Sequence, residues 1–271
     1  MYDEKHRITY YDLDSAGRLK MSAFLRMAHI AADVDAGRLG IGFREMSAMN
    51  VTFILNRFAL GISRMPEYGE TVRLRTWPDS VARGTFLRKG DMHDENGAKI
   101  MEWTSLWILF DITERKILKP TVLADVAPDL FSAVATGSDF GVESVRNRSE
   151  ESGRPISNGD LCAQRMVNIM PERIILPDDG ACAEFSRYTH TVRFSEVDTN
   201  MHMNNSVYGD LINNALGSAE NWREVQLNYL AETRLDEEID IAAHKDGDTF
   251  YVKGTAKDRA SFAARVVVSR K

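Results

Sequence analysis

Two segments of this chain resemble each other at a separation of 184 residues, as measured from Asp14 to Asp198. Residues 8–25 read "ITYYDLDSAGRLKMSAFL" and residues 192–209 read "VRFSEVDTNMHMNNSVYG", and they align without a gap. Each copy has the pattern of a short strand, an Asp-bearing loop and a helix. One repeat of so long a period predicts two duplicated domains rather than a solenoid. The matched pairs are Asp14/Asp198, Ser15/Thr199, Leu19/Met203, Ser22/Ser206 and Phe24/Tyr208.

Each copy continues into a helix with an apolar stripe. We expect the first helix over about residues 22–38 and the second from about residue 207. The Asn-Asn-Ser sequence at 204–206 is suited to capping, because these side chains accept hydrogen bonds from the N–H groups of a first helical turn. The predicted core positions are Phe24, Leu25, Ala28, Ala31 and Ala32 in the first helix, and Val207, Tyr208, Leu211, Ile212, Ala215, Leu216 and Ala219 in the second.

After each helix the pattern changes to strands. Partial alternation and β-branched or aromatic residues predict four antiparallel strands in each half, with "DENG" and "KDGD" as turns. The expected class is α+β, with a sheet curled around each helix. Residues 129–185 are rich in Ser, Gly, Asp and Arg and predict an irregular linker between domains at 1–128 and 186–271. The predicted strands are 51–63, 70–77, 84–94, 98–111, 224–233, 237–245, 249–256 and 260–269.

The stretch "DTNMHMNN" places Asp198, Asn200 and His202 at alternate positions before the second helix. Residues of this kind often only cap a helix or close a turn. The first copy argues for more, because Ala16 and Arg18 stand where the second has the amide and the imidazole. The shared aspartates can therefore serve the fold, whereas Asn200 and His202 are additions to one half. This asymmetry favours a functional site in the second half.

These groups suit acyl transfer to water. The Asp198 carboxylate can take a proton from water or attack a carbonyl carbon directly, and the Asn and His side chains can orient the carboxylate, the water or the carbonyl. The N–H groups near Asn204 and Asn205, at the helix start, can hold a developing oxyanion. A calcium loop is excluded, since Met203 replaces the required Gly and Gly209 the required Glu. We expect no metal and no organic cofactor.

The motif "DTNMHMNNSVY", followed by "LNYLAET", resembles the acyl-ACP thioesterases of bacteria and plants. The segment "GETVRLRTW" at 69–77 also looks like this family. The resemblance implies two tandem hotdog domains, each a long central helix wrapped by an antiparallel sheet, and hydrolysis of fatty acyl-ACP to free fatty acid. It implies acyl carrier protein as the partner, and a Glu in the strand after the second helix. The implied catalytic set is Asp198, Asn200, His202 and Glu232, with Asn204 and Asn205 in substrate binding.

The chain departs from its plant relatives at one informative position. Those proteins carry a Cys after the motif Glu, and this chain has Thr233. Cys162 and Cys182 are remote from the motif, so a Cys–His mechanism is not expected. The N-terminal sequence shows neither an apolar signal core nor a transit peptide, so we expect the bacterial type and a cytoplasmic location.

Three other functions remain open for such a sequence. An acyl-CoA thioesterase would use the same chemistry with another carrier. A non-catalytic hotdog protein would bind acyl thioesters without turnover. The related enoyl-thioester hydratases have one more residue before the His, so the shorter D-x-N-x-H spacing favours hydrolysis.

The net charge of −6 is unfavourable for binding nucleic acid, and no apolar run is long enough to cross a membrane. An acidic carrier protein would need a local basic patch. The sequence leaves monomer and homodimer open, and no role is assigned to His6, His29, His93, His190 or His244. The residues considered for the basic patch are Arg73, Arg75, Arg83, Arg88 and Lys89.

Overall fold

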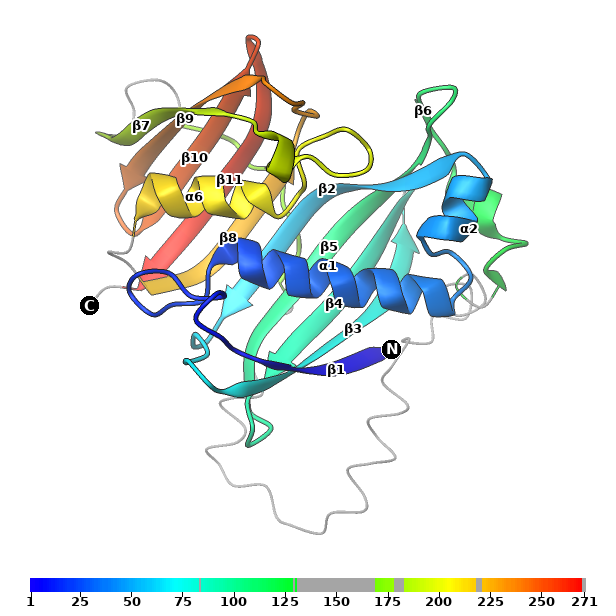
Figure 1. Cartoon of the computed structure of the whole chain (residues 1–271), viewed down its shortest axis with the longest axis horizontal. Coiled ribbons are helices and arrows are strands. Elements are labelled where there is room, and N and C mark those ends of the chain that lie inside the picture. The colour runs from blue at the N-terminus through cyan, green and yellow to red at the C-terminus, as the bar shows by residue number, and fades with distance from the viewer. Residues whose placement is uncertain (83, 129, 131–168, 178–182, 218–220, 270–271) are drawn as a thin grey trace.

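The computed structural model describes residues 1–82, 84–128, 130, 169–177, 183–217 and 221–269. Both cysteines and most of the predicted linker lie outside the described residues. The described chain forms one large antiparallel sheet and few helices (Figure 1). The helices are α1 (Met21–Arg38), α2 (Phe43–Ala48) and α6 (Val207–Leu216), with 3-10 turns η1 (Pro120–Leu123) and η2 (Phe194–Glu196). The strands are β1 (Tyr2–Arg7), β2 (Val51–Ile62), β3 (Thr71–Ala82), β4 (Thr85–His93), β5 (Lys99–Asp111), β6 (Lys116–Ile117), β7 (Ala183–Thr191), β8 (Asn221–Tyr229), β9 (Glu238–Asp246), β10 (Thr249–Ala256) and β11 (Arg259–Ser269).

The strand order is β1-β3-β4-β5-β2-β8-β11-β10-β9-β7, with β6 added to β5. Counted outward from the centre, both halves have the same connectivity, with the first strand of each half at an edge. Four antiparallel strands after each long helix were predicted, and this is confirmed. They do not form a simple meander, because β2 pairs with β5 rather than with β3. The halves join where residues 57–61 of β2 pair with residues 224–228 of β8.

Helices α1 and α6 lie on the same face of the sheet (Figure 1). Their apolar stripes contribute to one hydrophobic core that includes residues of both halves. In α1 the predicted positions are buried except Ala32, which is partly exposed. In α6 Val207 is partly buried and the other predicted positions are buried, while Ala219 lies outside the described residues. Helical spacing therefore identified the buried face correctly.

The starts of α1 and α6 pack closely against each other. A Cβ added at Gly209 would lie 2.6 Å from the backbone nitrogen of Ser22, so only glycine fits this contact. The Ser22 hydroxyl donates a hydrogen bond to Asp210, and the Met21 N–H donates to the Asn213 side chain at 2.9 Å. These contacts fix the two Asp-bearing loops relative to each other.

Several boundaries differ from the prediction. The expected strands at Ile8 and Val192 end just before these residues, as β1 and β7. Glu232 was expected within a strand but lies three residues beyond the end of β8. Helix α2 was not predicted, since six residues are too few for a clear periodic pattern. It covers a second, smaller apolar cluster beside β2, β4 and β5.

Of the predicted linker, residues 183–185 belong to β7, while residues 169–177 run along β8 and form neither helix nor strand. The side-chain amide of Gln226 accepts the Glu172 N–H at 3.0 Å, and that of Asn228 accepts the Ile174 N–H at 2.9 Å. The same amides donate to the Met170 and Glu172 carbonyls. Buried side-chain amides of the second half thus satisfy the backbone of this segment.

Candidate active site

The loop before α6 is a tight turn with its own hydrogen bonds. The Asp198 N–H donates to the His202 carbonyl at 2.9 Å, and the Asp198 carboxylate accepts the Asn200 N–H at 2.8 Å. Met201 occupies the left-handed region, with φ of 62°. The turn therefore holds Asp198, Asn200 and His202 in fixed backbone positions at the start of the helix.

The loop before α1 has the same backbone. The Asp14 N–H donates to the Arg18 carbonyl at 2.8 Å, and the Asp14 carboxylate accepts the Ala16 N–H at 2.9 Å. Gly17, at the position of Met201, also has positive φ. The duplication predicted from sequence is therefore present in atomic detail at these loops, and the shared aspartates close the same turn.

A histidine–carboxylate pair braces both loops. His190 Nε2 lies 2.9 Å from a carboxylate oxygen of Glu196, and the corresponding His6 lies 3.6 Å from Asp12. Neither histidine was assigned a role from sequence. Because the pair occurs at the same positions in both copies, it belongs to the fold.

The side chains of the two loops differ where the sequences differ. Arg18 forms an ion pair with Asp14 at 2.9 Å, so the first aspartate is bound by its own turn. His202 instead places Nε2 3.0 Å from a carboxylate oxygen of Glu232. In the described part of the chain no hydrogen bond joins the Asp198 side chain to either partner. The structure thus brings His202 and Glu232 together and leaves Asp198 beside them.

Hydrogen bonds also identify the first-half counterpart of Glu232. Glu67 and Arg234 each donate their N–H to the carboxylate three residues further on, at 2.9 and 3.1 Å. Glu67 therefore corresponds to Arg234. The residues two positions earlier, Met65 and Glu232, then correspond to each other. The first half therefore lacks both members of the pair, with Arg18 in place of His202 and Met65 in place of Glu232.

Asn204 and Asn205 play different parts. The Asn204 side chain accepts hydrogen bonds from the N–H and the hydroxyl of Ser206, at 2.9 and 2.8 Å, and so closes the turn that leads into α6. Its own N–H donates to the Glu196 carbonyl at 2.8 Å and is not available to an oxyanion. The prediction that the backbone N–H of Asn204 holds the substrate is therefore wrong. Of the two predicted amides, the Asn205 N–H has no protein acceptor among the described residues.

Thr233, which replaces the Cys of plant relatives, is buried and structural. Its carbonyl accepts the Met203 N–H at 2.7 Å, and its hydroxyl lies 2.7 Å from that of Ser261. The Tyr208 hydroxyl lies 3.3 Å from the Thr233 hydroxyl, and burial raises the pKa of Tyr208. These buried hydroxyl contacts anchor the loop before α6 to the sheet.

An apolar cavity of about 360 Å³ lies in the first half and reaches the loop of the second. Its walls come from α1, α2, β2, β4 and β5. Thr199 and Asn200 also line it. The first half thus supplies the pocket and the second half the polar loop beside it. This cavity was not predicted residue by residue, because its walls come from elements distant in sequence.

His29 on α1 lines the cavity as a neutral side chain. Burial lowers the pKa of His29 to about 4, and its Nε2 is buried with no hydrogen-bond partner. Its ring lies edge-on to those of Phe58 and Trp107. At neutral pH it behaves as part of an apolar wall.

The comparisons with known proteins agree with this arrangement. Family models match at both ends of the chain: the acyl-ACP thioesterase N-terminal domain at residues 1–129 and the C-terminal domain at 180–267. The chain belongs to the acyl-ACP thioesterase family. A chloroplastic palmitoyl-acyl carrier protein thioesterase from Gossypium hirsutum is 24% identical over 180 residues, 64% of this chain. That match spans 36% of the plant protein's length.

Solved structures support a hotdog-type fold. An acyl-ACP thioesterase from Bacteroides thetaiotaomicron gives a TM-score of 0.74 at 20% identity, covering 98% of this chain and 97% of that one. The 12:0-ACP thioesterase from Umbellularia californica gives 0.75 at 15% identity, covering 100% and 97%. At these identities the likeness establishes the fold and not the substrate.

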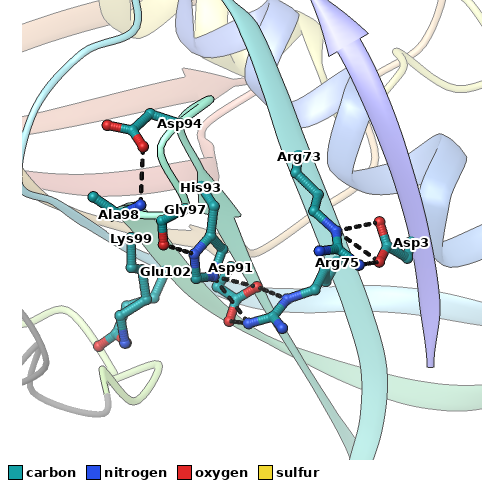
Figure 2. Close-up of polar contacts among 10 residues, drawn as sticks. All are labelled: Asp3, Arg73, Arg75, Asp91, His93, Asp94, Gly97, Ala98, Lys99 and Glu102. Carbon is teal, nitrogen blue, oxygen red and sulfur yellow. Dashed lines mark hydrogen bonds and ion pairs between the residues drawn. The ribbon is translucent and has the colours of Figure 1, made fainter. Parts of the chain in front are cut away.

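The four described candidates for the basic patch each pair with a carboxylate of this chain. Figure 2 shows Arg73 turned toward Asp3 and Arg75 toward Asp91, and the latter pair lies 2.6 Å apart. Hydrogen bonds from His93 and Arg75 outweigh burial and lower the pKa of Asp91. The other two described candidates are also ion-paired, Arg88 with Asp35 and Lys89 with Asp79, while the side chain of Arg83 lies outside the described residues.

A different basic group surrounds Glu232 and was missed from sequence. Arg115, in the turn after β5, lies 3.7 Å from the Glu232 carboxylate, and Arg234 lies 3.5 Å from it. No local pattern could have shown that Arg115 of the first half reaches a residue of the second. Among the described residues there is no cluster of three potential metal ligands, and no helix is long and apolar enough to span a bilayer.

Proposed function

We propose that the protein hydrolyses fatty acyl thioesters carried by acyl carrier protein, releasing the free fatty acid. The observation that carries this proposal is the contact of His202 with Glu232, since His202 lies on the loop whose Asn200 lines an apolar cavity. The cavity would hold the acyl chain, and the loop would meet the thioester at its end. Family membership and the Gossypium hirsutum relative support the substrate class.

The contact between His202 and Glu232 suggests a general-base mechanism. With Nε2 facing the carboxylate, the neutral imidazole carries its proton there, and Nδ1 is left as the acceptor. Nδ1 would take a proton from water while the water oxygen bonds to the thioester carbon. Collapse of the tetrahedral intermediate breaks the C–S bond, and the proton returns to the sulfur. The Asn205 N–H and the Asn200 side chain would stabilise the oxyanion.

Asp198 has two proposed roles that remain alternatives. Its carboxylate holds the Asn200 N–H and so orients the residue at the cavity wall. It can instead attack the thioester carbon and form an acyl anhydride that water then cleaves. Glu232 is the alternative base acting on water.

We further propose that the chain consists of two tandem hotdog units with one active site. The matching strand connectivity and matching loops support this division. The units correspond to residues 1–128 and 186–271, and because β7 begins at Ala183 the second extends a few residues earlier. A cytoplasmic location is part of the same proposal.

Two functions compete with this proposal, an acyl-CoA thioesterase and an acyl-thioester-binding protein without turnover. Hydrolysis of acyl-ACP and acyl-CoA of graded chain length, with and without EDTA, separates them. We expect turnover that is insensitive to EDTA and a higher kcat/KM for acyl-ACP. Equal or better kcat/KM with acyl-CoA would refute the carrier assignment, and no turnover of any thioester would refute the enzyme.

A further inference from the structure

Three arginines converge on Glu232 from separate parts of the fold. Arg115 and Arg234 lie 3.7 and 3.5 Å from its carboxylate, and Arg259 donates a hydrogen bond to its backbone carbonyl at 2.6 Å. Arg115 belongs to the first half, and Arg234 and Arg259 to the second. Their side chains are 63%, 54% and 48% exposed, so all three reach solvent beside the active site.

Glu232 alone does not occupy all the N–H donors of these three arginines. The contacts of Arg115 and Arg234 with the carboxylate are ion pairs longer than a hydrogen bond. Glu232 also holds His202 at 3.0 Å. Another carboxylate, Glu237, is bound by Lys257 at 2.6 Å and lies 3.9 Å from Arg259. In a chain with a net charge of −6, three arginines therefore gather around one carboxylate.

The corresponding places in the first half are not basic. By the hydrogen bonds described above, Glu67 corresponds to Arg234, so the charge is reversed. The carbonyls of Ser261 and Ile100 accept the equivalent N–H groups just beyond β8 and β2. Two residues before these carbonyls lie Arg259 and Ala98, so Ala98 corresponds to Arg259. As with His202 and Glu232, Arg234 and Arg259 have no basic counterpart in the first half and are not required by the shared fold.

We infer that Arg115 and Arg234 bind the phosphate of the 4′-phosphopantetheine arm on which the acyl group is delivered. The inference rests on the proposed function: because His202 and Glu232 are 3.0 Å apart, the arm of a thioester that reacts at His202 would lie within reach of the arginines around Glu232. Guanidinium groups suit this ligand, since their planar N–H donors match phosphate oxygens. Acyl-ACP and acyl-CoA share this phosphate, so the site recognises the arm rather than the carrier.

The test compares two substrates that differ only in the phosphate, acyl-4′-phosphopantetheine and acyl-pantetheine. The double variant Arg115→Gln/Arg234→Gln should lower the ratio of their kcat/KM values at least about tenfold, the effect of losing one charge-assisted hydrogen bond. The matched control is Arg223→Gln, an exposed arginine near the other end of β8, which should keep the wild-type ratio. Added salt should lower the wild-type ratio and affect that of the double variant less.

A ratio within twofold of wild type in the double variant would overturn the inference. So would an equal loss on both substrates, which would mean that the arginines only position Glu232. If the ratio is unchanged but acyl-ACP alone is hydrolysed more slowly, the arginines contact the acidic protein and not the phosphate. Binding of free 4′-phosphopantetheine and pantetheine, measured by calorimetry, decides the matter even without turnover: equal affinities refute it. Hydrolysis of acyl-pantetheine by the wild type tests the proposed function separately.

Discussion

In the loop before α1, Arg18 binds Asp14 of the same turn. In the loop before α6, His202 takes the place of Arg18 and contacts Glu232 instead. The two loops share their main-chain hydrogen bonds and the left-handed residue between them. The difference shows that the turn itself needs only an aspartate. Exchange of a few side chains on one backbone then separates a turn that binds its own aspartate from the turn that we propose to be catalytic.

A second division concerns the apolar cavity. Its walls come almost entirely from the first half, while the polar pair belongs to the second. Thr199 and Asn200 are the residues at which pocket and chemistry meet. The halves have therefore become complementary, and each can be altered separately by mutation.

The strongest test of the comparison is the matched pair Asp198→Asn and Asp14→Asn. Loss of a reacting acid or base lowers rates by about 10²–10⁴-fold, so Asp198→Asn should fold and be nearly inactive if the carboxylate itself reacts with the thioester. If Asp198 only holds the Asn200 N–H, the amide oxygen of the variant accepts the same hydrogen bond and activity should persist. Asp14→Asn should stay active, because Arg18 holds Asp14 in a structural role. Turnover of acyl-ACP and a thermal melt of each variant give the measurement. An inactive Asp14→Asn beside an active Asp198→Asn would place the chemistry in the first half.

A smaller effect is expected from filling the cavity. Ala32→Phe places a ring among residues that line it, so long acyl chains should lose more kcat/KM than short ones. Each methylene that can no longer be buried costs about 0.8 kcal/mol, or about fourfold in kcat/KM. The ratio of long-chain to short-chain kcat/KM is the readout, and the shortest accepted chain is the internal control. An unchanged chain-length profile would show that the acyl chain binds elsewhere.

The smallest effect concerns the stability contributed by Asp14. Burial opposes its ionisation, but hydrogen bonds from Arg18 and Ala16 outweigh burial and lower the pKa of the carboxyl. A lowered pKa stabilises the fold at neutral pH, and this stabilisation is lost as pH falls below about 4. Asp14→Asn should therefore cost about 1 kcal/mol in urea unfolding at pH 7 and almost nothing at acid pH. A cost that grows on acidification would contradict this assignment.

The sequence was informative where the chemistry is local. The duplication, the helix faces and the difference between Arg18 and His202 follow from residues close together in the chain. The assignment of Glu232 needed the family resemblance, because no local pattern links it to His202.

What could not be predicted depends on tertiary contacts. Three features join segments that are distant in the sequence. They are the strand order that sets β2 between β5 and β8, the cavity beside α2, and the contact of Arg115 with Glu232. The ion pairs of the candidate basic residues could not be predicted for a related reason. A run of arginines along β3 and β4 does not reveal the carboxylates that face it from β1, β4 and α1.

The pairing of β2 with β8 ties the halves into one sheet over a shared core. Neither half can then unfold without exposing an unpaired strand edge and apolar surface of the other. The whole chain should melt as one cooperative unit, and the slowest-exchanging amides of β2 and β8 should report the same free energy of opening. A destabilising change far away in the first half would then lower activity through the fraction of folded molecules, while each folded molecule works at the normal rate.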